Sequence, residues 1–406
     1  MEIKIILTNI SIKKINFSAL NKIMNIGILY PRSNAHPSIA IDFIDGIKVF
    51  LKQQDLHNDI NIISEGIGFG GVEKEVYEKS EKLLVIENVD ILIAYIDLKI
   101  IPFLQPLLSA TGKLLLVVNS GANYPYDWKP EPNIIYLGLQ NSFLCWLSGS
   151  LAGNSSNKNA LMATTFYDCG YLHTTAMVKS FVKKEGNITF NYVNNQNHND
   201  SFDIIQLTDF LSFDKETHNL LCVFDSEPAS MLYKHLNNFE NAEKLQLFVS
   251  PMMLEKKALE NLSGEYKFSI DGYIPWSCSI STESNIFFTD TFFQQKNKSA
   301  TIFSLLGWET GMIVQEIFLH CKDFYTHGKE VTTQLKKIKL NSPRGNMLLD
   351  EQTNYFISPV YKCSIKKHSA KMDVERIDHL QDTWEAFVKE PLEGLSSGWT
   401  NTYLCY

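Results

Sequence analysis

Short polar segments follow the most apolar runs of this 406-residue chain directly, and their side chains have the groups that hold small polar molecules. Asp225 and Ser226 come straight after one apolar run, and Ser33 and Asn34 follow another. When such runs are parallel strands, the residues after them gather at the carboxyl edge of a sheet, where open α/β sheets bind ligands. The pattern therefore predicts a polar binding cleft. For Asp225 and Ser226, capping of the next helix is the alternative.

Two further loops offer groups for the two ends of a charged ligand. The stretch 119–124 is small and polar, so Ser120 and its neighbours present hydroxyl and amide groups that suit a carboxylate. The stretch 166–171 combines aromatic rings with Asp168, whose carboxylate suits an ammonium group. One polar loop says little, but the recurrence of polar loops after successive strands favours a small-molecule cleft.

A glycine motif raises a second class of function. Gly66, Gly68 and Gly71 form G-x-G-x-x-G between an expected strand and an expected helix, which in dinucleotide folds places a helix N-terminus against a pyrophosphate. However, the motif follows the second strand instead of the first, and the acidic residue in range, Asp90, begins the third strand, away from a ribose. The alternatives are a two-domain nucleotide-dependent transferase and a glycine-rich turn that requires positive φ angles.

Other catalytic patterns do not occur in the sequence. It contains no G-x-x-x-x-G-K-[ST], H-E-x-x-H or G-x-S-x-G, and its ten histidines and seven cysteines show neither metal-ligand spacing nor a C-x-x-C pair. We therefore expect no enzyme activity, no metal and no cofactor, and the scattered cysteines favour a reducing compartment. The formal charge of −8 argues against a nucleic-acid partner.

The N-terminal segment is basic, with four lysines against one glutamate in its first 23 residues. Polar residues interrupt its apolar positions, so we do not identify a signal peptide in it. We expect residues 1–23 to be an extension, and a translation start at Met24 is the alternative. No run reaches the 18 apolar residues of a membrane span.

The elements that position these loops alternate regularly. Apolar runs predict strands at 26–30, 59–64, 89–95, 113–118 and 134–137, and amphipathic segments between them predict helices. The pattern restarts after the polar stretch 153–158, with strands expected at 160–164, 188–193, 220–224 and 245–249. Strands separated by helices indicate right-handed βαβ crossovers and parallel sheets, so we expect two α/β lobes in tandem.

The last third of the chain is less regular. It predicts a strand at 268–274, a long helix at 300–321, an extended segment at 355–365 and a final helix at 374–389. Such a tail can return to both lobes.

Four segments carry a family resemblance. IGILYPRSNAHPSIAIDFIDGIKVFLKQ (26–53) includes D-x-x-x-G-I-K, and VNSGANYP (118–125), FYDCGY (166–171) and SPRGNMLLDEQTNYFISPVYKCSI (342–365) follow it. In these segments the chain resembles the type I periplasmic solute-binding proteins, in particular the branched-chain amino-acid and amide-binding group. The resemblance covers the chain from Met24 to about Ile365.

The resemblance implies a fold and a division into lobes. It implies a clam-shell of two Rossmann-like lobes with parallel sheets, joined by three crossovers, that closes on a ligand by hinge motion. The expected N-terminal lobe is 24–142 plus 273–339, and the expected C-terminal lobe is 143–272 plus 340–406.

The resemblance also implies ligand contacts. By their positions in the matching segments and strand ends, the cleft residues are Ser33, Asn34, Ala122, Asn123, Tyr167, Asp168, Ser226 and Trp276, beside Ser120 and Asp225 from the strand-end argument. Tyr95 stands where the family usually has glycine, and Asn123 replaces a common threonine, which argues against an amino-acid ligand. A more aromatic pocket is expected from five rings, those of Tyr95, Tyr124, Tyr167, Tyr171 and Trp276. Burial in the core is the alternative for these rings.

The expected function is non-enzymatic binding of a small polar or zwitterionic molecule, such as an amino acid or amide, as a transporter-associated protein or a sensor. The expected partner is a membrane transporter or a regulatory protein that recognises the closed form. A homodimer is a further expectation. The resemblance favours a periplasmic location, whereas the unrecognised signal peptide favours the cytoplasm. Besides ligand binding and a nucleotide-dependent transferase, a third possible function is a scaffold that binds a partner protein and whose cleft no longer binds a ligand.

Overall fold

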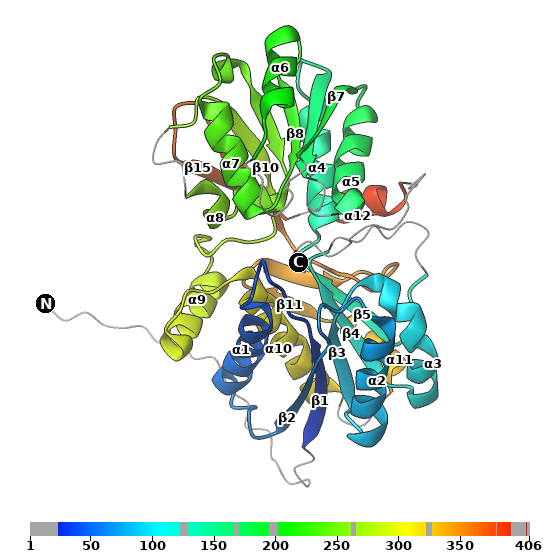
Figure 1. Cartoon of the computed structure of the whole chain (residues 1–406). Coiled ribbons are helices and arrows are strands. Elements are labelled where there is room, and N and C mark those ends of the chain that lie inside the picture. The colour runs from blue at the N-terminus through cyan, green and yellow to red at the C-terminus, as the bar shows by residue number, and fades with distance from the viewer. Residues whose placement is uncertain are drawn as a thin grey trace, which may run out of the picture.

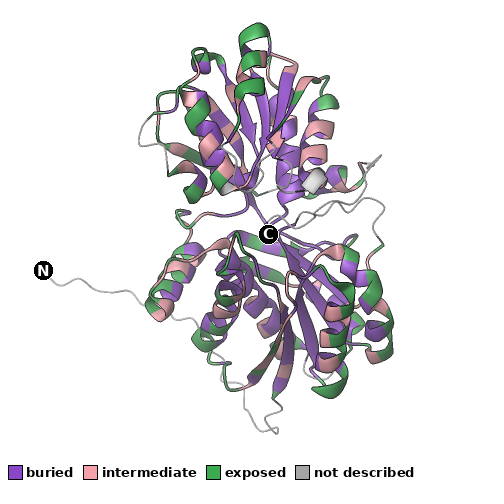
Figure 2. Cartoon of the chain, viewed as in Figure 1, coloured by how far each residue is buried: buried purple, intermediate pink, exposed green. Residues whose placement is uncertain are grey.

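The computed structural model describes residues 23–121, 129–165, 170–194, 202–260, 265–321, 327–378, 380–390 and 403. Two lobes lie one above the other, each with a central sheet covered by helices (Figure 1). The strands form the buried interior of both lobes, and exposed residues concentrate on the outer helices (Figure 2). The expected extension 1–23 lies outside the described residues, apart from its last residue.

The N-terminal lobe is built on a five-stranded parallel sheet of order β2-β1-β3-β4-β5. Three of its strands, β3, β4 and β5, are buried along their whole length, as expected when helices cover both faces of a parallel sheet. The strands are β1 (Met24–Tyr30), β2 (Ile60–Gly66), β3 (Ile91–Tyr95), β4 (Leu114–Asn119) and β5 (Ile134–Gly138). The helices between them are α1 (Ile39–Gln53), α2 (Glu73–Glu81) and α3 (Ile101–Thr111).

The C-terminal lobe has a seven-stranded sheet of order β15-β14-β10-β9-β8-β6-β7. Its parallel strands are β6 (Asn159–Thr165), β7 (Asn187–Asn194), β8 (Asn219–Val223), β9 (Gln246–Val249) and β10 (Ser269–Ile274). Two antiparallel strands, β14 (Val360–Ile365) and β15 (Met372–Ile377), extend one edge. The helices are α4 (Asn141–Gly153), α5 (Gly170–Val182), α6 (Ile205–Phe213), α7 (Ser226–Asn237) and the short α8 (Lys256–Leu259).

The last third of the chain serves both lobes. The helices α9 (Glu283–Lys296), α10 (Ile302–His320) and α11 (Gly328–Leu335) pack on the N-terminal lobe. A small antiparallel sheet follows, made of β11 (Lys339–Ser342), β12 (Gly345–Leu349) and β13 (Phe356–Ile357). The chain then enters the second sheet at β14 and ends its described helices with α12 (Gln381–Val388).

The chain passes between the lobes three times. The passages run from β5 to α4, from β10 to α9, and from β13 to β14. The expected fold class, two α/β lobes joined by three crossovers, is confirmed. The lobe boundaries remain a prediction, and the third one, between residues 339 and 340, falls inside β11, ahead of the last passage.

The prediction of a final helix at 374–389 is wrong for the first part of that range. Residues 372–377 form β15, whose backbone pairs with β14 along its whole length, from Val360 opposite Ile377 to Ile365 opposite Met372. The edge of a sheet offers unpaired backbone groups, and their hydrogen bonds outweigh the weak helical pattern here. Only α12 keeps the expected helical form, with Trp384 and Phe387 buried.

The close approach of α1 and α10 explains the D-x-x-x-G-I-K segment. A Cβ atom on Gly46 would run into the Ser304 carbonyl, and one on Gly307 would run into the Phe43 carbonyl, so the two backbones touch only because neither residue has a side chain. Asp42, the first residue of the segment, accepts hydrogen bonds from Ser38 and Thr301 and pairs with Lys298. The segment therefore locks α1 onto the start of α10.

Among the described helices, only α10 is long and apolar enough to cross a membrane by length and composition. In the window concerned, 67% of the residues are buried within the lobe. A core helix of a folded domain passes the same test.

Candidate functional site

The loop after β1 carries the first wall of the site. The amide of His36 donates to the hydroxyl of Ser33 at 3.0 Å, a local turn that orients the loop. The loop is also tied to the one after β2, since the Arg32 amide donates to the Gly68 carbonyl at 2.7 Å. Ser33 is thereby buried, and His36 is brought to the boundary between the lobes.

His36 meets a carboxylate of the other lobe. Its Nε2 lies 3.4 Å from Oδ2 of Asp225, which follows β8 at the carboxyl end of that strand. The side chains are 15% and 13% exposed, so water reaches both and screens the contact. Two strand-end loops from different sheets therefore meet at one place, as expected for a site between lobes.

An aromatic ring from the C-terminal end of the chain lies at the same place. The Tyr403 ring is 5.1 Å from the His36 ring and 5.3 Å from the Phe303 ring, in edge-to-face geometry with both. Its hydroxyl donates to Oε1 of Glu255 at 2.6 Å. His36 and Phe303 belong to the N-terminal lobe and Glu255 to the C-terminal lobe, just before α8. We call these residues, with Asp225, the interlobe site.

The Tyr403 phenol is held in its protonated form. Burial raises its pKa well above the ordinary value, and the nearby Glu255 and Asp225 carboxylates act in the same direction. The residue is 1% exposed. The hydroxyl is therefore a permanent donor near neutral pH, and Glu255 is its acceptor.

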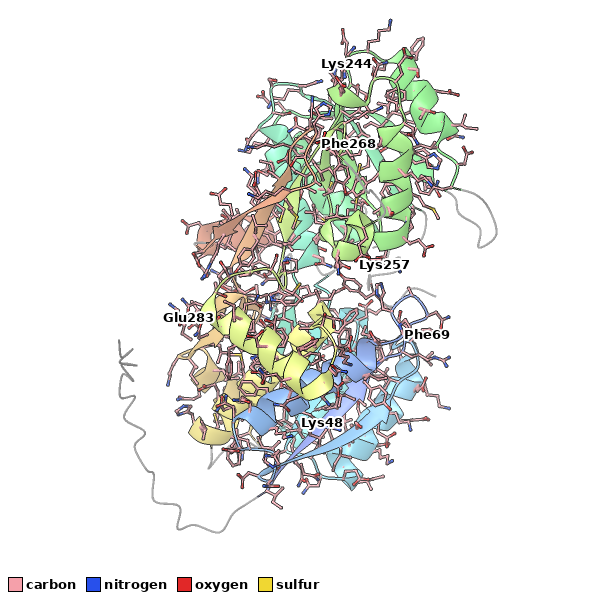
Figure 3. All side chains as sticks on the ribbon, turned by 90° about the vertical axis from the view of Figure 1, so that its left-hand side faces the viewer. Lys48, Phe69, Lys244, Lys257, Phe268 and Glu283 are labelled. Atoms are coloured by element: carbon pink, nitrogen blue, oxygen red, sulfur yellow. The ribbon has the colours of Figure 1, made fainter. Side chains whose placement is uncertain are left out.

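The boundary between the lobes is visible from the side. Phe69, in the loop after β2, lies at the upper edge of the N-terminal lobe, and Lys257 of α8 lies at the facing edge of the C-terminal lobe (Figure 3). The guanidinium carbon of Arg32 sits 4.5 Å from the centre of the Phe69 ring. Lys244 and Phe268 lie at the far end of the C-terminal lobe, away from this boundary (Figure 3).

Two other residues expected in the site, Ser120 and Tyr95, are buried in the structure. Ser120 is fully buried, and its carbonyl accepts from the first amide of α4 at 3.3 Å, beside the first passage between lobes. Tyr95 is inside the N-terminal core, 5.6 Å from the Phe43 ring, and its hydroxyl has no hydrogen-bond partner among the described residues. Burial raises the pKa of Tyr95.

Trp276 lies on the second passage between lobes. Its Nε1 donates to Oδ1 of Asn285 at 2.6 Å, and its ring packs against Phe288 at 5.9 Å. Asn34 is exposed in the loop after β1. Ser226 begins α7, but its side chain is outside the described part of the structure. Ala122, Asn123, Tyr167 and Asp168 also lie outside the described residues, so their expected roles remain predictions.

The glycine motif forms a turn that is poorly suited to phosphate. Gly68 and the neighbouring Gly70 have positive φ angles of 55° and 74°, which agrees with the expectation of a glycine-rich turn. The helix that follows, α2, has Glu73 and Glu75 in its first turn. Because carboxylates already occupy the positive end of the helix dipole, a pyrophosphate would meet repulsion there.

A buried ion pair fastens the third passage between lobes. Arg344, between β11 and β12, donates from Nε to Oε1 of Glu309 at 2.8 Å and from Nη2 to Oε2 at 2.6 Å. Its Nη1 donates to the carbonyl of Gly138 at the end of β5, at 3.1 Å, and its own carbonyl accepts from Tyr361 of β14 at 2.9 Å. Both charged side chains are fully buried. This crossover cluster, Glu309, Arg344, Gly138 and Tyr361, connects elements of both lobes.

The sequence did not reveal four residues of the interlobe site, nor any residue of the crossover cluster. His36 and Glu255 follow strands β1 and β9, so the strand-end rule used for Asp225 could have identified them. Tyr403 and Phe303 carry no local signal, because neither follows a strand of the sheets. Within the described residues, no group of three or more His, Cys, Asp or Glu side chains could hold a metal ion.

Comparison with solved structures identifies the fold. A solute-binding protein of an ABC transporter from Rhodopseudomonas palustris, in complex with 3,4-dihydroxybenzoic acid, is 13% identical with a TM-score of 0.69, over 90% of this chain and 99% of that one. An ABC transporter substrate-binding protein from Sphaerobacter thermophilus is 15% identical with a TM-score of 0.72, over 87% of this chain and 98% of that one. The protein LivJ of Streptococcus pneumoniae, in complex with isoleucine, is 12% identical with a TM-score of 0.63, over 88% and 100%.

No protein-family model and no curated protein sequence matches the chain. The likeness is therefore one of fold, and it extends over nearly the whole length of the solved proteins. The chain has the two-lobed fold of the type I solute-binding proteins, as the resemblance in its sequence implied.

Proposed function

We propose that the chain binds one small polar molecule between its lobes without changing it chemically, and that binding stabilises the closed arrangement of the lobes. The observation that carries this proposal is the meeting of His36 and Asp225, from the carboxyl ends of β1 and β8, at 3.4 Å across the boundary. In open α/β sheets this edge is where ligands bind. The fold shared with ABC transporter solute-binding proteins supports the same function.

The chemistry of the interlobe site sets what the ligand must offer. Asp225 and Glu255 are hydrogen-bond acceptors from the C-terminal lobe, and Phe303 and His36 are rings from the N-terminal lobe. Such a site suits a molecule with an apolar or aromatic body and a donor group, such as an ammonium or hydroxyl. Ala122, Asn123, Tyr167 and Asp168 are proposed as further contacts, with Asn123 toward the anionic end.

The proposed partner that recognises the closed form is a membrane transporter. Support comes from structurally similar proteins, which are solute-binding proteins of transporters with benzoate, 4-hydroxybenzoate or isoleucine bound. A regulatory protein that senses closure is the alternative, and homodimerisation remains a prediction. A nucleotide-dependent transferase is disfavoured, because the acidic first turn of α2 opposes phosphate at the glycine motif.

Calorimetric titration with a set of amino acids and aromatic acids tests the function. The Asp225→Ala variant should weaken binding of the ligand by about tenfold to a hundredfold, since a hydrogen bond to a charged group contributes about 1.5–3 kcal/mol. The matched control is Asp214→Ala, because Asp214 accepts from Thr217 at the opposite edge of the same sheet. Equal losses in both variants, or no ligand for the wild-type chain, would contradict a site between the lobes.

A further inference from the structure

The ring of Tyr403 fills the interlobe site completely enough to be shielded from water. Only 1% of the residue is exposed. The contacts that bury it come from both lobes, with His36 and Phe303 on one side and Glu255 on the other.

The contacts match both parts of a hydroxyphenyl group. His36 and Phe303 are 5.7 Å apart and edge-to-face, and each also stands edge-to-face to the Tyr403 ring, so three rings form a mutual cage. Aromatic pairs in this geometry are more favourable than their buried area alone predicts. At the far end of the ring, Oε1 of Glu255 accepts a hydrogen bond from the hydroxyl at 2.6 Å. A carboxylate acceptor makes this a charge-assisted hydrogen bond, which is stronger than a neutral one.

A core tyrosine would not need this arrangement. The phenol of Tyr233, for comparison, is fully buried within one lobe and donates to a backbone carbonyl, that of Met253. Tyr403 instead links two lobes at the edge where their strand-end loops meet. Its surroundings offer what a hydroxyphenyl group needs, with two rings around its ring and an acceptor at its hydroxyl.

We propose that the interlobe site is a receptor for a hydroxyphenyl group, and that Tyr403 is its built-in occupant, which a free phenolic ligand must displace. The proposal rests on the proposed function and narrows its ligand to molecules with an aromatic ring and a hydroxyl donor. An occupant on the same chain competes at a high effective concentration, so the site of the intact chain accepts only ligands that bind more favourably than Tyr403. Tyr403 thus sets a threshold for binding.

The test compares the intact chain with Tyr403→Ala by calorimetric titration with 4-methylphenol, the free analogue of the tyrosine side chain. Removing the occupant should tighten 4-methylphenol binding by about tenfold or more, because the binding-competent fraction rises. Toluene, which has the ring but no hydroxyl, should bind the variant more weakly than 4-methylphenol. Adding Glu255→Ala to the variant should reduce that preference, because the carboxylate acceptor is gone while Asn141 can still contact the hydroxyl.

Phe213→Ala is the matched control, since it removes an 89% exposed ring and should leave 4-methylphenol binding unchanged. Equal affinity of the intact chain and Tyr403→Ala, or no binding to either, would overturn the proposal. If the intact chain nevertheless binds an amino acid in the Asp225 titrations, the proposed function stands and only the occupant is refuted.

Discussion

Two polar groupings connect the lobes, and they are built in opposite ways. The crossover cluster is dry, with Glu309 and Arg344 fully buried and joined by two hydrogen bonds of 2.8 and 2.6 Å. In the interlobe site, the contact between His36 and Asp225 is 3.4 Å long and partly exposed to water, although Tyr403 beside it is buried. The crossover cluster is tied to the Gly138 carbonyl of one lobe and the Tyr361 hydroxyl of the other, whereas His36 and Asp225 join the side chains of two loops.

The difference indicates which part of the molecule is fixed and which can move. Removing one partner of a buried ion pair leaves a buried charge without compensation, so separating the residues of the crossover cluster costs much free energy. A partly exposed contact at 3.4 Å adds little, because water replaces it when it breaks. The lobes are therefore expected to pivot about the crossovers and to separate at the interlobe site, as in hinge closure around a ligand.

The largest expected effect comes from the crossover cluster. Glu309→Leu should lower the free energy of unfolding by about 3–5 kcal/mol, because Arg344 would be left buried and unpaired. Urea denaturation measures this. The double variant Glu309→Leu with Arg344→Met should recover much of the loss, and a loss below about 1 kcal/mol in the single variant would show that the cluster does not fix the crossover.

The second effect concerns the helices that carry part of the site. Gly307→Val should lower the free energy of unfolding by about 1–3 kcal/mol or more, since the new side chain would push against the Phe43 carbonyl of α1. Because Phe303 lies one turn earlier on α10, the same change should disturb the interlobe site. Gly71→Ala is the control, as no atom lies within 4 Å of its added Cβ, and equal losses would refute the close-approach argument.

The smallest expected effect is the pH-dependent contribution of Asp45, on α1, to the free energy of unfolding. Burial acts to raise the pKa of Asp45, but hydrogen bonds from Lys296 and Lys298 outweigh it and lower the pKa below its ordinary value. Asp45 therefore contributes stability at pH values above the unfolded-state pKa, and loses it as the pH falls through the lower folded-state pKa. We expect about 0.5–1 kcal/mol, since both partners keep some contact with water.

Urea denaturation of Asp45→Asn and the wild-type chain between about pH 6 and pH 2 measures this contribution, given an unfolded-state pKa near 3.9. The two curves should differ near pH 6 and converge at the acid end. A constant difference over the whole range would assign the effect of the substitution to packing instead of charge.

The sequence predicts the lobes well because their signals are local. Buried parallel strands such as 114–119 are continuous apolar runs, and these can be recognised without knowing the fold. The strand-end rule placed Asp225 at the interlobe site, because it depends only on the order of strand and loop. In contrast, β15 is a strand because β14 offers it a pairing edge, and no local pattern reveals that edge.

The remaining parts of the sites depend on contacts between distant residues. Glu309 and Arg344 are charges that a sequence places at the surface, and only the fold shows that they bury each other. Tyr403 meets Glu255 across 148 positions, and His36 meets Asp225 across 189. No spacing rule covers such distances, so these pairings follow from the packing of two complete lobes.

Small-angle X-ray scattering of the chain, with and without a ligand found by calorimetry, tests the central claim most directly. A shift from a mostly open to a mostly closed population requires a preference of about 5.5 kcal/mol for the closed form, which a ligand gripped by both lobes can supply. We expect a smaller radius of gyration with ligand, and a smaller change in Asp225→Ala at the same subsaturating ligand concentration. Unchanged dimensions of the wild-type chain at saturating ligand would contradict it.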